Sequence, residues 1–217
     1  MTARHDVAVV FDLDGTLVDT MSSAPQAYAD TIRSLGGPAV SPSEVVAVWH
    51  IGPTAVVLEH FLGRPVSLRD TERFHRHFAD VVASVEAFPG VVEMLDALSR
   101  SDHRLGVFTT ATRRAATSML TAAGLAEYFP VVVGGDEVSR PKPAPDGLEL
   151  SCRRLGTGVT EAVYVGDAAV DLQCAEAANA SGIHAAWGSA NGNDPTAEHI
   201  AQRPHDVVEL VRQLQTR

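Results

Sequence analysis

The chain has 217 residues, 45% of them hydrophobic and 20% charged, which predicts a globular protein of one domain or of one domain with an insertion. The 17 Lys and Arg against 27 Asp and Glu give a net charge of −10, which argues against nucleic acid or an anionic membrane as a partner. The two cysteines, the lack of an apolar run of about 18 residues and the lack of a signal peptide predict a cytoplasmic protein.

The first apolar run, residues 7–11, is rich in valine and does not alternate with polar residues. This pattern predicts a strand that is buried on both faces of a parallel sheet. Helical patterns without an intervening strand follow it, over residues 24–35, 54–62 and 74–85. The turn-forming sequence Phe88-Pro89-Gly90 then ends this helical stretch.

From about residue 90 onward, strand and helix patterns alternate. The apolar runs predict strands over residues 105–108, 131–133, 162–165 and 183–187. Helical patterns cover residues 91–98, 115–123, 148–155 and 207–214. The alternation predicts an α/β fold with a doubly wound parallel sheet. We therefore expect a core domain of residues 1–17 and 87–217 and a small helical domain of residues 18–86.

Two aspartates follow the first predicted strand, in the sequence Phe11-Asp12-Leu13-Asp14-Gly15-Thr16. Residues i and i+2 of an extended segment point to the same side, so Asp12 and Asp14 are expected to lie together at the carboxyl edge of the sheet. Because close carboxylates repel each other, a metal cation or a shared proton must stabilise them. An EF-hand calcium loop is excluded, because Leu17 stands where that loop needs glycine. A solvated acidic turn remains the alternative.

A second acidic segment, Gly166-Asp167-Ala168-Ala169-Val170-Asp171, follows the strand predicted over residues 162–165. Helix capping explains one of its two aspartates. Alternatively, Asp167 meets Asp12 and Asp14 across neighbouring strand ends. Carboxylate and carbonyl oxygens together with water suit Mg²⁺, so this alternative predicts a magnesium site.

Two further segments are suited to binding a phosphate group. The strand predicted over residues 105–108 ends at Thr109 and Thr110, where a hydroxyl and backbone amides are suited to phosphate. Thr112 fits the N-cap of the next helix. Lys142 lies among three prolines that stiffen its loop, although a solvated surface lysine is the alternative.

In their order and spacing, these four segments resemble the signature motifs of the haloacid dehalogenase (HAD) superfamily of aspartate-nucleophile phosphotransferases. The resemblance covers essentially the whole chain and is greatest to phosphoglycolate phosphatase-like and β-phosphoglucomutase-like proteins. It implies a HAD-like Rossmannoid core, and the helical domain of residues 18–86 looks like the C1-type cap of that family.

The resemblance also implies roles for individual residues. Asp12 would be the nucleophile that forms an aspartyl-phosphate, and Asp14 would be the general acid and base. Phosphate or substrate contacts would come from Thr109, Thr110, Lys142 and, in a cap loop, His50. Mg²⁺ would be held by Asp12, the backbone carbonyl of Asp14 and Asp167, with Asp171 orienting a metal-bound water or Lys142.

The implied function is that of a Mg²⁺-dependent phosphatase, a monomer or homodimer that acts on a small phosphorylated metabolite. An acid at Asp14 favours a leaving group that needs a proton, such as the alcohol of a phosphate ester. The alternatives are a phosphomutase and a non-catalytic module that binds a phospho-ligand. The cap region lacks the Gly-x-x-Arg of mutases, and the intact Asp12 and Lys142 argue against a non-catalytic module. Ala168 departs from the serine found in many relatives.

Overall fold

The computed structural model describes residues 7–20, 24–188 and 196–215. The chain divides into two compact units. Unit 1 comprises residues 1–19 and 86–217, and unit 2 comprises Thr20–Val85. The two chain segments that border unit 2 are paired within unit 1, because the amide of Asp19 donates to the carbonyl of Glu86 and that of Phe88 to Leu17, both at 3.1 Å.

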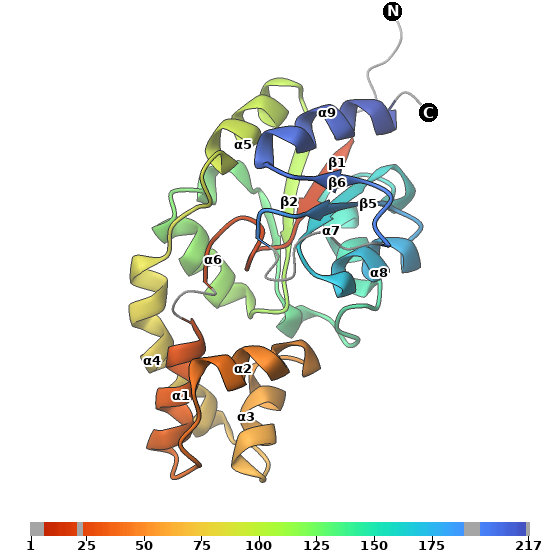
Figure 1. Cartoon of the computed structure of the whole chain (residues 1–217). Helices are drawn as coiled ribbons and strands as arrows, with labels where there is room; N and C mark the ends of the chain where they lie inside the picture. Colours follow the sequence, from red (N-terminus) through yellow and green to blue (C-terminus); the bar gives the residue numbers. More distant parts are fainter. Residues whose placement is uncertain (1–6, 21–23, 189–195, 216–217) are drawn as a thin grey trace, which may run out of the picture. The chain divides into compact units, whose positions relative to one another are not determined.

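Unit 1 contains a six-stranded parallel sheet with the strand order β3-β2-β1-β4-β5-β6 (Figure 1). The strands are β1 (Ala8–Phe11), β2 (Arg104–Phe108), β3 (Val131–Val133), β4 (Val163–Gly166), β5 (Ser181–Ala185) and β6 (Ile200–Ala201). The chain builds outward from β1 to β3, then returns to the other side of β1 and continues with β4. The direction of the strand order therefore reverses between the neighbours β1 and β4. Open α/β sheets bind their ligands at the carboxyl ends of the strands at such a topological switch point.

The parallel α/β class predicted from the sequence is confirmed. Two details of the sheet differ from the prediction. The strand predicted over residues 183–187 lies two residues earlier, so Trp187 falls in the turn that follows β5. The sheet also has a sixth strand, β6, which was not predicted because its two residues carry no detectable sequence pattern.

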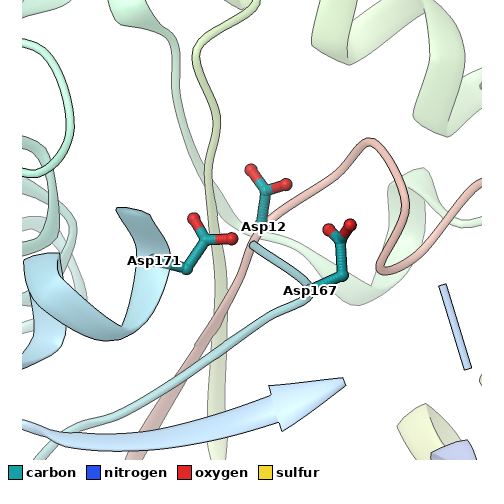
Figure 2. A group of neighbouring side chains, drawn as sticks. All are labelled: Asp12, Asp167 and Asp171. Atoms are coloured by element: carbon teal, nitrogen blue, oxygen red, sulfur yellow. The ribbon is translucent and has the colours of Figure 1, made fainter. Parts of the chain in front are cut away.

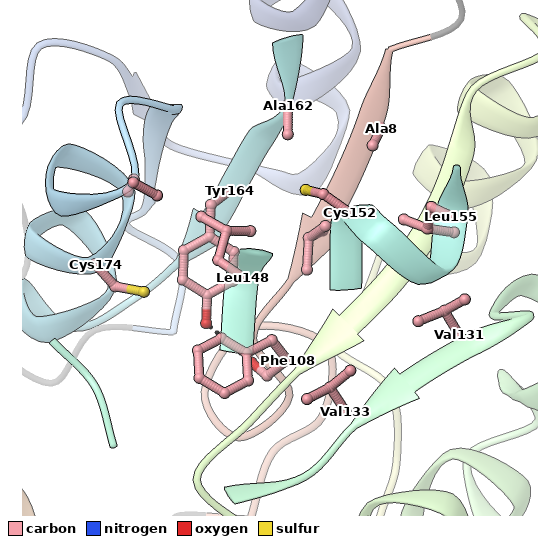
Figure 3. Packing of buried hydrophobic residues seen from close by; sticks show 13 residues of the cluster. Ala8, Phe108, Val131, Val133, Leu148, Cys152, Leu155, Ala162, Tyr164 and Cys174 are labelled. Carbon is pink, nitrogen blue, oxygen red and sulfur yellow. Dashed lines mark hydrogen bonds between the residues drawn. The ribbon is translucent and has the colours of Figure 1, made fainter. Parts of the chain in front are cut away.

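The helices of unit 1 are α5 (Val91–Arg100), α6 (Arg113–Ala122), α7 (Asp146–Leu155), α8 (Ala169–Ala177) and α9 (Pro204–Gln215), with short 3-10 helices at Ala126–Tyr128, Gly135–Glu137 and Val159–Glu161. Helices α7 and α8 pack on one face of the sheet and build the cluster in Figure 3. This cluster consists of Ala8, Val10, Phe108, Val131, Val133, Leu148, Cys152, Leu155, Ala162, Tyr164, Cys174, Ala175 and Ala178.

Strand β1 is buried on both of its faces. Ala8 and Val10 belong to the cluster under α7 and α8, whereas Val9 and Phe11 point to the opposite face and are equally buried. This two-sided burial explains why the sequence of β1 is uniformly apolar and lacks alternation. The strand therefore holds the residue that follows it, Asp12, in a fixed position.

Unit 2 is entirely helical in its described part, with α1 (Ala24–Ser34), α2 (Pro42–Val48), a 3-10 helix (Trp49–Ile51), α3 (Thr54–Leu62) and α4 (Leu68–Ser84). Helix α2 is short and was not predicted from the sequence. A capping box of Ser41 and Glu44 starts it. In the core of the unit, the ring of Tyr28 packs against those of Trp49 and Phe74. No helix in the part of the chain that the structure describes is both long and apolar enough to span a membrane.

Candidate active site

Three neighbouring strands end at one edge of the sheet and present polar residues there. Asp12 follows β1, Thr109 follows β2 and Asp167 follows β4. The register aligns Phe11, the last residue of β1, with Val107 on one side and Val165 on the other. The predicted meeting of these chain segments at the carboxyl edge is therefore present in the structure.

Three carboxylates gather at this edge, those of Asp12, Asp167 and Asp171 (Figure 2). One carboxylate oxygen from each lies within 4.8 Å of the others. Asp12 and Asp171 are buried, and Asp167 is half-buried. Figure 2 shows their carboxyl groups turned toward a common space, with Asp171 reaching it from α8.

Crowding and burial make it unfavourable for two of these carboxylates, those of Asp12 and Asp167, to carry their charges. The pKa of Asp12 is raised well above its usual value, mainly by burial and further by the charges of Asp171, Asp167 and Asp14. The pKa of Asp167 is raised to about 7 by burial and by Asp171, although a hydrogen bond of 3.1 Å from the Thr16 hydroxyl opposes the shift. A bound cation would compensate the negative charges of the three carboxylates. Carboxylate oxygens are ligands that fit a hard divalent cation.

Lys142 is the cation that the fold itself supplies. Its ammonium Nζ lies 2.6 Å from Asp12 Oδ1 and 2.7 Å from Asp171 Oδ1, and only 3% of the side chain is exposed. The alternative of a solvated surface lysine is therefore wrong. The charge of Lys142 lowers the pKa of Asp12 and so favours the ionised carboxylate.

Asp171 has protein partners on both of its carboxylate oxygens. Oδ1 accepts from Lys142, and Oδ2 accepts from the backbone amide of Ala168 at 3.1 Å. The second contact is a helix-capping bond at the start of α8, so the capping interpretation holds for Asp171 together with the lysine contact. Asp167 instead accepts from Thr16.

The segment after Asp12 turns instead of continuing the strand. β1 ends at Phe11, and the carbonyl of Leu13 accepts the amides of Leu17 and Val18. That Asp12 and Asp14 lie together at this edge stays a prediction. Asp14 is half-buried, and its charge still acts on Asp12. Its carboxylate is outside the group of three, and the metal contact implied for it is through the backbone carbonyl.

Glycine is required in this turn because the turn packs tightly against Asp167. Gly15 has a φ of 81°, and a Cβ atom built on it would lie 2.5 Å from Asp167 Oδ2. On the side of β5, the indole Nε1 of Trp187 donates to the carbonyl of Thr16 at 3.0 Å. No site role was predicted for Trp187, because its apolar neighbours in the sequence predict a strand there.

The threonines after β2 divide between the edge of the sheet and the next helix. Thr109 is fully buried, and its hydroxyl accepts the amide of Ala111 at 3.1 Å, while Thr110 is exposed. Thr112 caps α6 by accepting the amide of Ala115 at 3.3 Å, as predicted. His50 belongs to the 3-10 helix Trp49–Ile51 of unit 2, and its side chain lies outside the described part of the chain.

Comparison with known proteins identifies the family. Residues 9–185 match the family model described as haloacid dehalogenase-like hydrolase. The chain belongs to this family. The family, fold class and hydrolase class predicted from the sequence are thereby confirmed.

Individual relatives of this HAD-family hydrolase carry names of phosphate chemistry. This chain is 37% identical to "Phosphoglycolate phosphatase, plasmid" of Cupriavidus necator, over 88% of this chain and 85% of the relative. The crystal structure of a putative β-phosphoglucomutase from Thermotoga maritima matches with a TM-score of 0.72 and 25% identity, over 95% of this chain and 99% of the other. CbbY from Rhodobacter sphaeroides, solved in complex with phosphate, matches with a TM-score of 0.80 and 23% identity, over 92% and 95% of the two chains.

Proposed function

We propose that this HAD-family phosphatase hydrolyses a small phosphomonoester through a covalent aspartyl-phosphate on Asp12. The observation that carries the proposal is the pairing of Asp12 with Lys142, buried at the carboxyl edge of the sheet beside Asp167 and Asp171. A carboxylate next to a fixed cation is suited to act as a nucleophile toward phosphorus, because the cation favours the ionised form. The names of the relatives support a phosphatase in preference to a phosphomutase or a binding module.

The reaction proceeds in two displacements at phosphorus. In the first, an Asp12 oxygen attacks the phosphorus, the ester P–O bond breaks, and Asp14 donates a proton to the leaving alcohol. In the second, Asp14 takes a proton from a water molecule that attacks the same phosphorus. The acyl-phosphate P–O bond then breaks, which releases inorganic phosphate and regenerates Asp12.

The other residues bind and orient the phosphoryl group. Lys142 and Thr109 hold phosphoryl oxygens, whose charge is redistributed in the transition state. Asp171 holds Lys142 in place through its Oδ1. Mg²⁺, when bound by Asp12, the Asp14 carbonyl and Asp167, supplies positive charge that offsets the repulsion between the phosphate and the Asp12 carboxylate.

The proposed substrate is a small phosphomonoester such as phosphoglycolate, the substrate in the names of several relatives. We assign residues 18–86 to a C1-type cap on a core of residues 1–17 and 87–217. The family resemblance implies that such a cap excludes bulk water during the reaction, and it assigns a substrate contact to His50. Such a cap disfavours large phosphoproteins as substrates.

The direct test is to measure phosphate release from p-nitrophenyl phosphate and from phosphoglycolate, with Mg²⁺ and after treatment with a chelator. Turnover that requires Mg²⁺ is the expected result. Turnover that continues unchanged without a divalent cation would contradict the metal assignment. Transfer of phosphate to a second hydroxyl without release would show a mutase, and phosphate binding without any turnover would show a binding module.

Asp14→Asn separates the acid role from other effects of the side chain. The loss with phosphoglycolate is expected to be about 10²- to 10⁴-fold, because its alkoxide leaving group needs a proton. The loss with p-nitrophenyl phosphate is expected to be much smaller in the first step, since nitrophenolate leaves without one. The measurement is single-turnover release of the leaving group from both substrates. Equal losses would contradict the acid role.

Mg²⁺ is expected to stabilise the protein more at pH 8 than at pH 6. The pKa of Asp167 is raised to about 7 in the folded protein. Below pH 7 and without metal, the folded protein therefore binds more protons than the unfolded chain. Its stability consequently falls as the pH rises toward 7. Mg²⁺ needs the deprotonated carboxylate, so its affinity should rise about tenfold from pH 6 to pH 8. With Mg²⁺ in excess, this corresponds to about 1.4 kcal/mol, or roughly 3–6 °C in the shift of Tm.

Thermal unfolding with and without Mg²⁺ at the two pH values measures this difference. Asp167→Asn is the matched variant, because it removes the titrating group while keeping the shape of the side chain. It should reduce the pH dependence of the Mg²⁺ shift, because only the contribution of the other carboxylates then remains. An equal Mg²⁺ shift at both pH values in the wild-type protein would contradict the assignment of Asp167 as a ligand.

A further inference from the structure

The ammonium group of Lys142 is enclosed by two carboxylates and two aromatic rings. Besides its ion pairs with Asp12 and Asp171, Nζ lies over the ring of Phe108 at 5.0 Å and over that of Tyr164 at 5.2 Å from the ring centroids. Both distances are within the range of cation–π attraction, which is strongest when water is excluded. We call these four residues the lysine cage.

The two rings of the lysine cage are themselves fixed. The Tyr164 hydroxyl donates to the carbonyl oxygen of Phe108 at 2.9 Å (Figure 3). It also lies 3.3 Å from Asp171 Oδ1. The ring of Phe108 is held from the side of α7, because a Cβ built on Gly147 would lie 2.1 Å from its Cε2 atom. The Tyr164 side chain thus connects the end of β2, directly before Thr109, with the carboxylate that holds Lys142.

We propose that Tyr164 and Phe108 are positioning residues, which hold the Lys142 ammonium at one point beside Asp12. A lysine side chain has a flexible four-carbon stem, and two ion pairs alone leave it free to shift between carboxylate oxygens. The rings close the remaining sides of the ammonium. They also replace water that would weaken its interaction with a developing negative charge.

For the reaction, this proposal rests on the proposed function, in which Lys142 binds a phosphoryl oxygen. A shift of the ammonium by about 1 Å should reduce the rate of phosphoryl transfer up to 10²-fold. Binding of the substrate should change less, because the ground state makes other contacts. The alternative is that Tyr164 and Phe108 only fill the core, in which case their substitution would affect stability alone.

The composition of the chain permits a direct measurement, because Lys142 is its single lysine. Protein labelled with ¹³C- and ¹⁵N-lysine therefore gives one set of lysine side-chain signals by NMR. We expect the Hε protons to be shifted upfield by the ring currents of Phe108 and Tyr164. Phe108→Leu should reduce this shift, and Tyr164→Phe should keep both rings but move the signals as the ammonium loses its fixed position.

Kinetics on the same variants test the effect on the reaction. Tyr164→Phe, which removes only the hydroxyl oxygen, should lower kcat by about 10- to 100-fold with KM changed less than about twofold. Tyr128→Phe is the matched control, because it removes a hydroxyl that donates to another aspartate, Asp96, at 2.6 Å. It should leave kcat, KM and the lysine signals unchanged.

The possible results separate the two proposals. Wild-type lysine signals at random-coil positions would overturn the lysine cage, and so would a Tyr164→Phe variant with normal kcat. Loss of kcat together with a shifted lysine signal would support the lysine cage. If Phe108→Leu does not fold, Tyr164→Phe alone provides both measurements. If the wild-type protein hydrolyses no phosphate ester, the proposed function fails, whereas the NMR arm still decides whether the rings hold Lys142.

Discussion

Asp12→Asn is expected to reduce the turnover of phosphate esters by about 10⁴-fold or more. The amide has nearly the shape of the carboxylate, but it is uncharged and cannot form a hydrolysable acyl-phosphate with phosphorus. Acid quenching of the reaction with ³²P-labelled substrate should trap a phosphoenzyme in the wild-type protein and none in the variant. The two measurements test the covalent route independently.

The folded structure should tolerate this substitution. Asp12 is crowded by Asp167 and Asp171, so a neutral side chain relieves repulsion at the same time as it weakens the ion pair with Lys142. We therefore expect a Tm within a few degrees of that of the wild-type protein, which makes misfolding a poor explanation for lost activity. Appreciable turnover in Asp12→Asn would show that the covalent route is wrong.

Lys142→Met is expected to have the second largest effect, a loss of about 10²- to 10³-fold in kcat/KM. Lys142 lowers the pKa of Asp12 against the effect of burial, so its removal should raise that pKa further. A larger fraction of Asp12 would then be protonated near pH 7 and inactive as a nucleophile. The residual activity should consequently rise with pH over a range where wild-type activity is already level.

Stability should fall as well, by about 3–5 kcal/mol, because the buried Asp171 carboxylate loses its cation. Arg140→Gln is the matched control on the same loop, since the Arg140 side chain is 69% exposed and pairs with Asp146. It should leave activity unchanged and reduce stability by less than about 1 kcal/mol. A pH profile of Lys142→Met parallel to that of the wild-type protein would contradict the role of Lys142 in ionising Asp12.

The fold could be predicted from the sequence where a buried strand leaves a continuous run of apolar residues. The uniformly apolar β1 and β4 show their two-sided burial in the sequence, and the alternation of strands and helices gives the parallel class. β6 has only two residues, and its place is set by pairing with β5, which leaves no local pattern. The turn at Gly15 could be predicted from its glycine, whereas the return of the chain onto the carbonyl of Leu13 leaves no local pattern in the sequence.

The candidate site was predictable to the extent that its residues follow strand ends. Asp12, Thr109 and Asp167 could be assigned to one edge because parallel strands share it. The burial of Lys142 could not be derived in this way, because it depends on the close approach of α7 to Phe108. That approach requires the absence of a side chain at Gly147. Tyr164 and Phe108 are ordinary strand residues in the sequence, and only the packing of distant segments brings their rings to the lysine.

The central place of β1 has a consequence for the synthesis of this protein on the ribosome. β1 is synthesised first among the strands of the sheet, whereas its neighbours β2 and β4 follow much later. The contact of Asp12 with Lys142 joins residues 130 positions apart, and that of Thr16 with Asp167 joins residues 151 positions apart. The nascent chain therefore exposes an apolar strand with two unpaired edges until most of unit 1 has emerged. Chains that terminate before β4 should lack a stable core and be substrates for chaperones and proteases, whereas unit 2 is formed by one continuous segment of the chain.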